Sequence, residues 1–147
     1  MCIRDSHELV KELGLELNVT FSPHISGRQA LYGLFDIVAM PVLKGGVGVT
    51  AIESMAMGRP LITSGLGEML HLVKDGETGL LFPEGDVEAL AARILELIRN
   101  PEEISRIGES ARSWVEKEFV LDPMVDETID FYAECLDRID EERTIEA

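Results

Sequence analysis

A run of glycines that leads into a short apolar helix is the part of this sequence best suited to binding chemistry. The stretch KGGVGVTAIESMAMGRP places Gly45, Gly46 and Gly48 directly before the expected helix. Glycine lets a backbone come close to a bound group because it has no Cβ. The free amides and the dipole at a helix start favour an anion. The loop therefore predicts a place for a phosphate group.

One carboxylate, Glu53, stands in the middle of this apolar helix. Between Thr50 and Arg59 the only polar side chains are Glu53 and Ser54. A carboxylate is costly to bury unless something hydrogen-bonds it, and either a polar ligand or an arginine of the same fold would do so. A glycine turn alone is weak evidence. Loop and carboxylate together indicate a site for a phosphorylated, hydroxyl-rich ligand such as a nucleotide sugar.

Length and composition indicate one ordinary domain with a real core. The chain has 147 residues, of which 46% are hydrophobic, and its formal net charge is −15. This charge argues against a nucleic-acid partner or an anionic membrane surface. No apolar run is long enough to span a bilayer, so no transmembrane segment is expected. No signal peptide is visible, and we expect a cytoplasmic protein.

Cysteine and histidine spacing shows neither a metal-ligand pattern nor a disulfide framework. The cysteines are Cys2 and Cys135, no CxxC motif occurs, and the three histidines are widely separated. Residues 1–6, MCIRDS, resemble the peptide translated from a transposase adapter used to make sequencing libraries. We expect residues 1–6 to be an adapter-derived artefact and exclude them from fold reasoning. The alternative is a natural N-terminus.

The elements that would position the loop alternate between helix and strand up to Phe82. Expected helices cover residues 7–15, 27–35, about 49–57 and 67–74, with Gly14 and Gly58 as helix ends and Ser26 in a capping box. Expected strands cover residues 18–22, 36–42, 60–64 and 80–83. Such alternation implies a parallel sheet with right-handed crossovers, in which ligands bind at the carboxyl ends of strands. The glycine loop follows strand 36–42 and so belongs to that edge.

Beyond Phe82 the pattern is helical. Asp86 is expected to cap a helix over residues 87–100, and Asn100-Pro101 a second helix to about Phe119. Asp122-Pro123 repeats this device for a final helix from about Met124 to Glu141, followed by an acidic tail.

Six short motifs resemble, in order and spacing, the C-terminal half of retaining glycosyltransferases of the GT-B type, the group-1 or family-four class. They are NVTF (18–21), ALYGLFDIVAMP (30–41), GGVG (45–48), ESMAMGRP (53–60), DGETGLLF (75–82) and GDVEALA (85–91). The resemblance implies an α/β fold, in which a Rossmann-like parallel sheet is flanked by helices and followed by C-terminal helices. We expect a partial nucleotide-sugar-binding domain at 7–121 and a C-terminal helix with its acidic tail at 122–147.

The same resemblance implies donor-binding roles for individual positions. Glu53 matches the second Glu of the family's E-x7-E motif, which holds the ribose hydroxyls. The loop before it matches backbone amides that meet the sugar and the distal phosphate, and the turn at 24–26 lies near the nucleobase. The implied donor-binding residues are Gly45, Gly46, Val47, Gly48, Val49, Glu53, His24 and Ile25.

Several positions depart from the family pattern. The first Glu of E-x7-E falls at Gly45, the family's Phe in E-G-F-G is Val47, and Pro23 stands where a Gly is usual. The usual G-G-x-P-E reads Gly67 to His71, without its Pro and Glu. His71 could replace a polar donor-side group, but a packed or exposed helix histidine is the favoured interpretation.

The leading functional hypothesis is a fragment of a retaining glycosyltransferase, inactive alone, whose intact form transfers a sugar from a nucleotide-diphosphate-sugar donor to a hydroxyl acceptor. The resemblance implies catalytic residues upstream of His7, no metal, and a glycan, lipid or small-molecule acceptor bound through a missing N-terminal domain. That domain could place the protein peripherally at the inner membrane face. The alternative is a non-catalytic nucleotide-sugar-binding or scaffold relative. A phosphoacceptor receiver is disfavoured because Asp36 begins its strand instead of ending it.

Overall fold

A small parallel sheet lies at the centre of the molecule. The computed structural model describes residues 3–22, 27–44 and 48–145. Three strands pair in parallel in the order β1-β2-β3. The strands are β1 (Val38–Met40), β2 (Leu61–Ser64) and β3 (Leu80–Phe82). The helices are α1 (Ile3–Glu12), α2 (Arg28–Tyr32), α3 (Val49–Ala56), α4 (Met69–Leu72), α5 (Val87–Arg99), α6 (Pro101–Glu118) and α7 (Leu121–Ile145). The expected α/β fold is confirmed.

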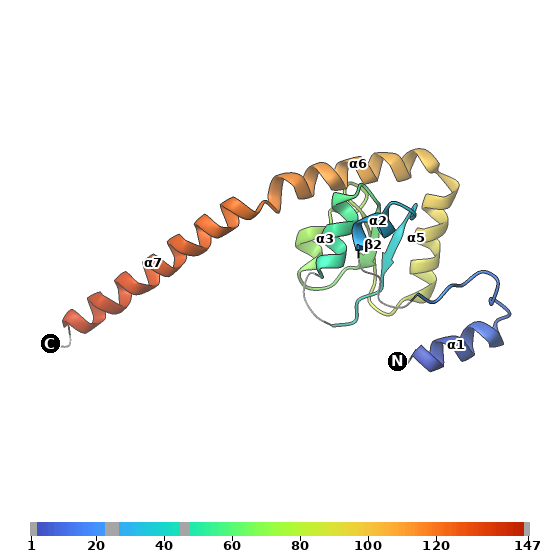
Figure 1. Cartoon of the computed structure of the whole chain (residues 1–147), viewed down its shortest axis with the longest axis horizontal. Helices are drawn as coiled ribbons and strands as arrows, with labels where there is room; N and C mark the ends of the chain where they lie inside the picture. The colour runs from blue at the N-terminus through green and yellow to red at the C-terminus, as the bar shows by residue number, and fades with distance from the viewer. Residues whose placement is uncertain (1–2, 23–26, 45–47, 146–147) are drawn as a thin grey trace.

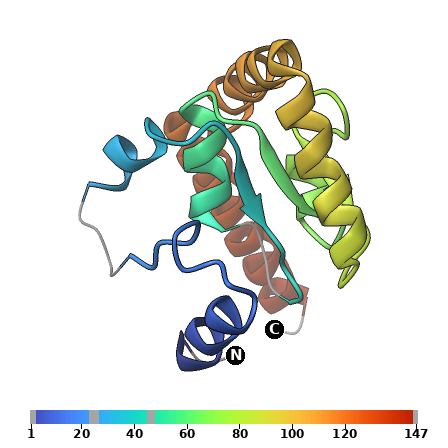
Figure 2. The same ribbon diagram turned by 90° about the vertical axis from the view of Figure 1, so that its right-hand side faces the viewer.

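Strand β2 is buried on both faces, as expected for the central strand of a parallel sheet. On one face Leu61 belongs to a core with α3, α4 and α6 side chains. On the other face Ile62 packs with Leu97 of α5 and Ile107 of α6. Helices α3 and α5 consequently lie on opposite sides of the sheet (Figures 1 and 2). Helix α7 runs outward from this body, and α1 lies apart from the sheet (Figure 1).

Helix α6 crosses α3 where two glycines bring the backbones together. A Cβ built on Gly108 would lie only 2.2 Å from the carbonyl oxygen of Gly58. Gly58 has a φ of +66° and ends α3. Its amide donates to Met55 O at 2.9 Å, and the Arg59 amide donates to Ser54 O at 3.0 Å. The buried side chains of the two helices at this contact are Ala51, Met55, Ala111 and Val115.

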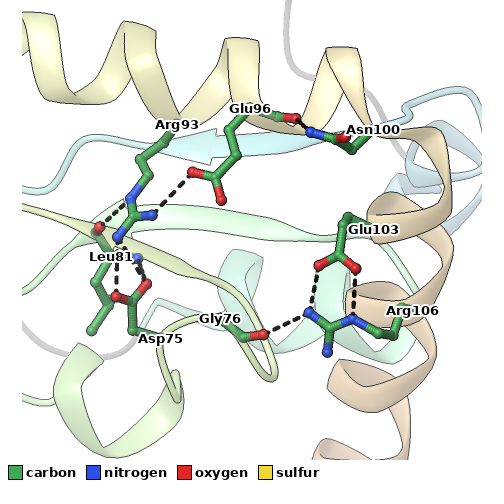
Figure 3. A network of polar contacts seen from close by, with 8 residues as sticks. All are labelled: Asp75, Gly76, Leu81, Arg93, Glu96, Asn100, Glu103 and Arg106. Atoms are coloured by element: carbon green, nitrogen blue, oxygen red, sulfur yellow. Dashed lines mark hydrogen bonds and ion pairs between the residues drawn. The ribbon is translucent and has the colours of Figure 1, made fainter.

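A polar network closes the outer edge of β3 (Figure 3). The Leu81 amide donates to Asp75 Oδ1 at 2.9 Å, and Arg93 Nε donates to Leu81 O at 3.1 Å. Arg93 also pairs with the Asp75 carboxylate at 3.0 Å. These side chains satisfy the backbone groups that an edge strand would otherwise offer to another chain. The expected turn at 75–79 therefore stabilises the edge of the sheet.

Most element boundaries expected from capping signals are confirmed. Gly14, with a φ of +65°, ends α1. Asp86 accepts the Ala89 amide at 2.9 Å and so caps α5. The prediction that Asn100 caps α6 is wrong for its side chain, which makes no capping hydrogen bond to α6. The Asn100 side chain instead donates to Glu96 O at 2.7 Å, at the end of α5. Pro101 does occupy the first position of α6.

Four local predictions need correction. Residues 18–22 form no strand, because no described strand lies beside them and an isolated strand is unstable. Gly27, in the left-handed region, is the N-cap of α2 without a side-chain bond, and Ser26 lies outside the described residues. Helix α2 ends at Tyr32, well before residue 35. Helix α7 begins at Leu121, so Asp122 lies inside its first turn, where a proline is tolerated.

Helix α1 begins at Ile3, within the segment expected to be an artefact. Residues 3–6 are thus helical, whatever their origin, and the division of the chain at 6 and 121 stays a prediction.

We expect Gly108→Ala to destabilise the fold by about 3 kcal/mol, because the new methyl group would collide with the Gly58 carbonyl. Helix propensity alone predicts the opposite sign, since alanine favours a helix by about 1 kcal/mol over glycine. Urea unfolding measures the difference. Glu109→Ala, at the exposed neighbouring position, is the control and is expected to change stability by less than about 0.5 kcal/mol. Equal or greater stability of Gly108→Ala would contradict the close contact.

Glu103 predicts an acid-dependent stability. Hydrogen bonds from the Arg106 guanidinium lower the pKa of the Glu103 carboxyl below its ordinary value of 4.5. A carboxyl group whose pKa is lower in the folded state than in the unfolded state stabilises the fold at pH values above its unfolded-state pKa. This stabilisation is lost as the pH falls through the folded-state pKa. When the pH is lowered from 7 to 3, we expect the free energy of unfolding to fall less for Glu103→Gln than for the wild type. Urea unfolding at both pH values checks this, with exposed Glu102→Gln as control, and identical pH slopes would refute it.

We expect the 147-residue chain to unfold broadly and to self-associate. Strand β1 is an edge strand, and no described strand covers its outer side. Helix α7 exposes apolar side chains such as Leu121, Phe131 and Tyr132. Circular dichroism melts combined with light scattering measure both properties. A sharp, cooperative transition of a monomer would contradict this expectation.

Candidate functional site

The start of α3 lies at the carboxyl end of β1, as the sequence predicts. A Cβ on Gly48 would lie 3.5 Å from the Met40 side chain, which ends β1. Gly48 is the N-cap of α3 in an extended conformation, and its carbonyl accepts the Ala51 amide at 2.8 Å. No side chain caps this helix start. The first turn of α3 therefore directs its amides and positive dipole end toward the edge where parallel sheets bind ligands.

The side of α3 that faces away from the core carries a single carboxylate. Val49, Glu53 and Met57 follow the spacing of one helix face, and Ala56 beside them also packs against the core. Val49 is exposed and Glu53 is half-buried, whereas Ala51 and Met55 are buried on the opposite side. The Glu53 carboxylate thus lies about one helical turn, roughly 6 Å, below the helix start.

A tyrosine hydroxyl holds this carboxylate. Tyr32, the last residue of α2, donates from its hydroxyl to Glu53 Oε2 at 3.1 Å. The Thr50 carbonyl lies 3.5 Å from the same hydroxyl. Arg59, which follows α3, donates to Gly33 O at 3.1 Å, and the expected alternative of an arginine partner for Glu53 stays a prediction. The hydroxyl is a neutral donor, so this hydrogen bond orients the carboxylate without itself supplying a counter-charge.

A hollow of about 370 Å³ opens between α2 and α3 beside this pair. It is lined by Ala30, Glu53, Ala56 and Met57. This volume falls within the range of roughly 300–1,000 Å³ typical of small-molecule sites. An apolar wall with one fixed carboxylate suits a ligand that presents hydroxyl groups on one side and carbon on the other.

Two other hollows have less suitable chemistry. One of about 490 Å³ lies at the corner between α6 and α7 and is mostly apolar. Another of about 550 Å³ lies along the outer side of α6, next to Trp114. Lys74 Nζ covers the Trp114 ring at 3.7 Å, and Trp114 Nε1 donates to Leu72 O at 3.0 Å. Trp114 is therefore already bonded within the fold, and the hollow at the α6–α7 corner is mostly apolar. The hollow beside Glu53 is the candidate site.

The structure brings three of the implied donor-binding residues, Gly48, Val49 and Glu53, together on the first turns of α3. The other implied residues lie outside the described residues and stay predictions; they are Gly45, Gly46, Val47, His24 and Ile25. His71 lies exposed on α4, in agreement with the favoured interpretation of an exposed helix histidine.

Tyr32 is the site residue to which the sequence analysis assigned no role. The signal for it was present, because a tyrosine among apolar neighbours normally needs a partner for its hydroxyl. The sequence could not name that partner, because Glu53 lies 21 positions further along the chain.

Two general properties of the described ranges bear on function. Within these ranges, no group of three or more His, Cys, Asp and Glu residues could hold a metal ion. No helix of the same ranges has the length and apolar character needed to cross a membrane.

Comparison with known proteins identifies the family. Residues 5–114 match the family of glycosyl transferases group 1. The match covers most of the chain, so this chain belongs to that family, and the resemblance to the C-terminal donor-binding part of GT-B glycosyltransferases is confirmed.

Individual relatives agree with this assignment. The chain is 28% identical over 137 residues to an MMP α-(1→4)-mannosyltransferase from Mycolicibacterium hassiacum, covering 91% of this chain and 33% of that protein. Sucrose-phosphate synthase from Thermosynechococcus elongatus superposes with a TM-score of 0.84 at 29% identity, covering 92% of this chain and 34% of the synthase. HepE from Anabaena, solved in complex with UDP, gives a TM-score of 0.86 at 22% identity, covering 90% and 36% of the two chains, and shows the same fold. The chain spans about a third of the length of these relatives.

Proposed function

We propose that this chain supplies the nucleotide-sugar half-site of a retaining glycosyltransferase. The whole enzyme would transfer a sugar from a nucleotide-diphosphate-sugar donor to a hydroxyl acceptor. The observation that carries the proposal is the Glu53 carboxylate, held by Tyr32 at the wall of a hollow and one turn below the start of α3. Family membership supports sugar transfer in general. HepE, a protein of the same fold, was solved in complex with UDP, and this complex supports a nucleotide donor.

The proposed binding mode follows from the chemistry of these groups. Glu53 accepts hydrogen bonds from neighbouring ribose hydroxyls, which are charge-assisted and therefore strong. The amides at the start of α3, beginning with Val49, stabilise the diphosphate. As the glycosidic bond to the diphosphate breaks, negative charge grows on the leaving oxygen, and the helix start offsets part of it. Transfer with retention then depends on how the acceptor is placed relative to the donor.

Other parts of the proposal concern the whole protein. We propose that catalytic and acceptor-binding groups come from a further domain, which holds a glycan, lipid or small-molecule acceptor. Basic side chains and helix dipoles, in place of a metal ion, neutralise the diphosphate. The enzyme works in the cytoplasm, either free or peripherally at the inner membrane face.

The alternative function is a non-catalytic nucleotide-sugar-binding or scaffold protein of the same family. Gly45, where the family has a Glu, and the altered segment from Gly67 to His71 favour it. Both functions predict donor binding, so binding alone does not separate them. Sugar transfer by the whole protein supports the enzyme, whereas donor binding without transfer to any acceptor supports the alternative.

We expect Glu53→Gln to weaken binding of a nucleoside diphosphate by about 1–3 kcal/mol, because a charge-assisted hydrogen bond becomes a neutral one. Isothermal titration of the intact protein, of which this chain is a part, with UDP, GDP and ADP measures this loss. Glu102→Gln, an exposed position on α6, is the matched control and should bind like the wild type. An unchanged Kd for Glu53→Gln would remove Glu53 from the site. Failure of the intact wild-type protein to bind any of the three would overturn the half-site.

A further inference from the structure

The tyrosine beside Glu53 is held too rigidly to be an incidental neighbour. The Tyr32 side chain is 4% exposed and belongs to the core formed by α3, α6 and β2. Its ring meets Phe35 edge-on, with ring centres 6.3 Å apart and planes at 80°. A buried ring cannot swing without disturbing the core, so its hydroxyl is a fixed point at the edge of the site.

The short helix that carries Tyr32 is anchored to α3 at a second place. Arg59, just after the end of α3, donates from its guanidinium to Gly33 O at 3.1 Å, one residue beyond Tyr32. The hydroxyl reaches Glu53 in the middle of α3. Helix α2 is thus held against α3 at two separated points, which fixes the direction from which the hydroxyl approaches the carboxylate.

A tyrosine suits this task better than an arginine. A glutamate side chain has several rotatable bonds, and a bound ligand would otherwise have to order them. A carboxylate has about four acceptor positions, of which a tyrosine hydroxyl takes one and a bidentate arginine takes two. The Tyr32 hydroxyl orients the carboxylate and brings no positive charge of its own to it.

We propose that Tyr32 is a positioning residue that orients Glu53 toward the ribose hydroxyls of the donor and so makes the site selective for a ribose bearing them. This inference rests on the proposed nucleotide-binding function. Tyr32 acts through Glu53 and needs no contact with the ligand itself.

The test compares UDP with 2′,3′-dideoxy-UDP, which lacks both ribose hydroxyls, on the intact protein by isothermal titration. We expect Tyr32→Phe to weaken UDP binding about 5-fold and to leave dideoxy-UDP binding unchanged. The Tyr32→Phe/Glu53→Gln double variant should bind UDP no more weakly than Glu53→Gln alone, because both changes remove the same contact. Tyr132→Phe, on α7 and 65% exposed, is the matched control and should bind both nucleotides like the wild type.

The outcomes separate this inference from the function on which it rests. Equal losses for UDP and dideoxy-UDP in Tyr32→Phe would mean a merely structural role and overturn the inference, as would unchanged UDP binding. If Glu53→Gln weakens UDP binding while Tyr32→Phe does not, only the inference fails. If Glu53→Gln also leaves UDP binding unchanged, the proposed function fails with it.

Discussion

The close approach of Gly108 to Gly58 is the constraint on which the arrangement of this domain depends. A side chain at Gly108 would occupy the space of the Gly58 carbonyl, so only glycine lets α6 lie this close to the end of α3. Pro60 lies at the same contact, and its carbonyl accepts the Val38 amide at 3.0 Å. One helix crossing thus sets the end of α3, the start of β2 and the pairing of β2 with β1.

The crossing of α6 and α3 also makes the candidate site rigid. Helix α3 is held from the core side by α6 and β2, so the direction in which its outer face presents Glu53 is set before any ligand arrives. Tyr32 completes the orientation from α2. A half-buried carboxylate is an expensive feature in an apolar helix. Glu53 lies beside a hollow and accepts the Tyr32 hydroxyl, which agrees with the binding role proposed for it.

The family motifs divide into those that serve the fold and those that face the site. The turn DGETG belongs to the first group. A Cβ on Gly79 would lie 2.7 Å from Leu61 O, and Asp75 with Arg93 satisfies the edge of β3. Glu53 belongs to the second group, since α3 begins at the carboxyl edge of β1. In the DGETG turn, close packing against Leu61 is therefore the reason for the glycine at position 79.

The class of fold, most helix ends and the choice of Glu53 as a candidate site residue could be predicted from the sequence. These features are local: a buried strand reads as an apolar run, Asp86 caps the helix that directly follows it, and a carboxylate is conspicuous within an apolar helix. Three features became known only from the folded chain: residues 18–22 have no strand partner among the described residues, Asn100 bonds backward to α5, and Tyr32 holds Glu53. Strand pairing and side-chain contacts join positions far apart in the chain. Their outcome depends on how the helices pack around the sheet, which no short stretch of sequence encodes.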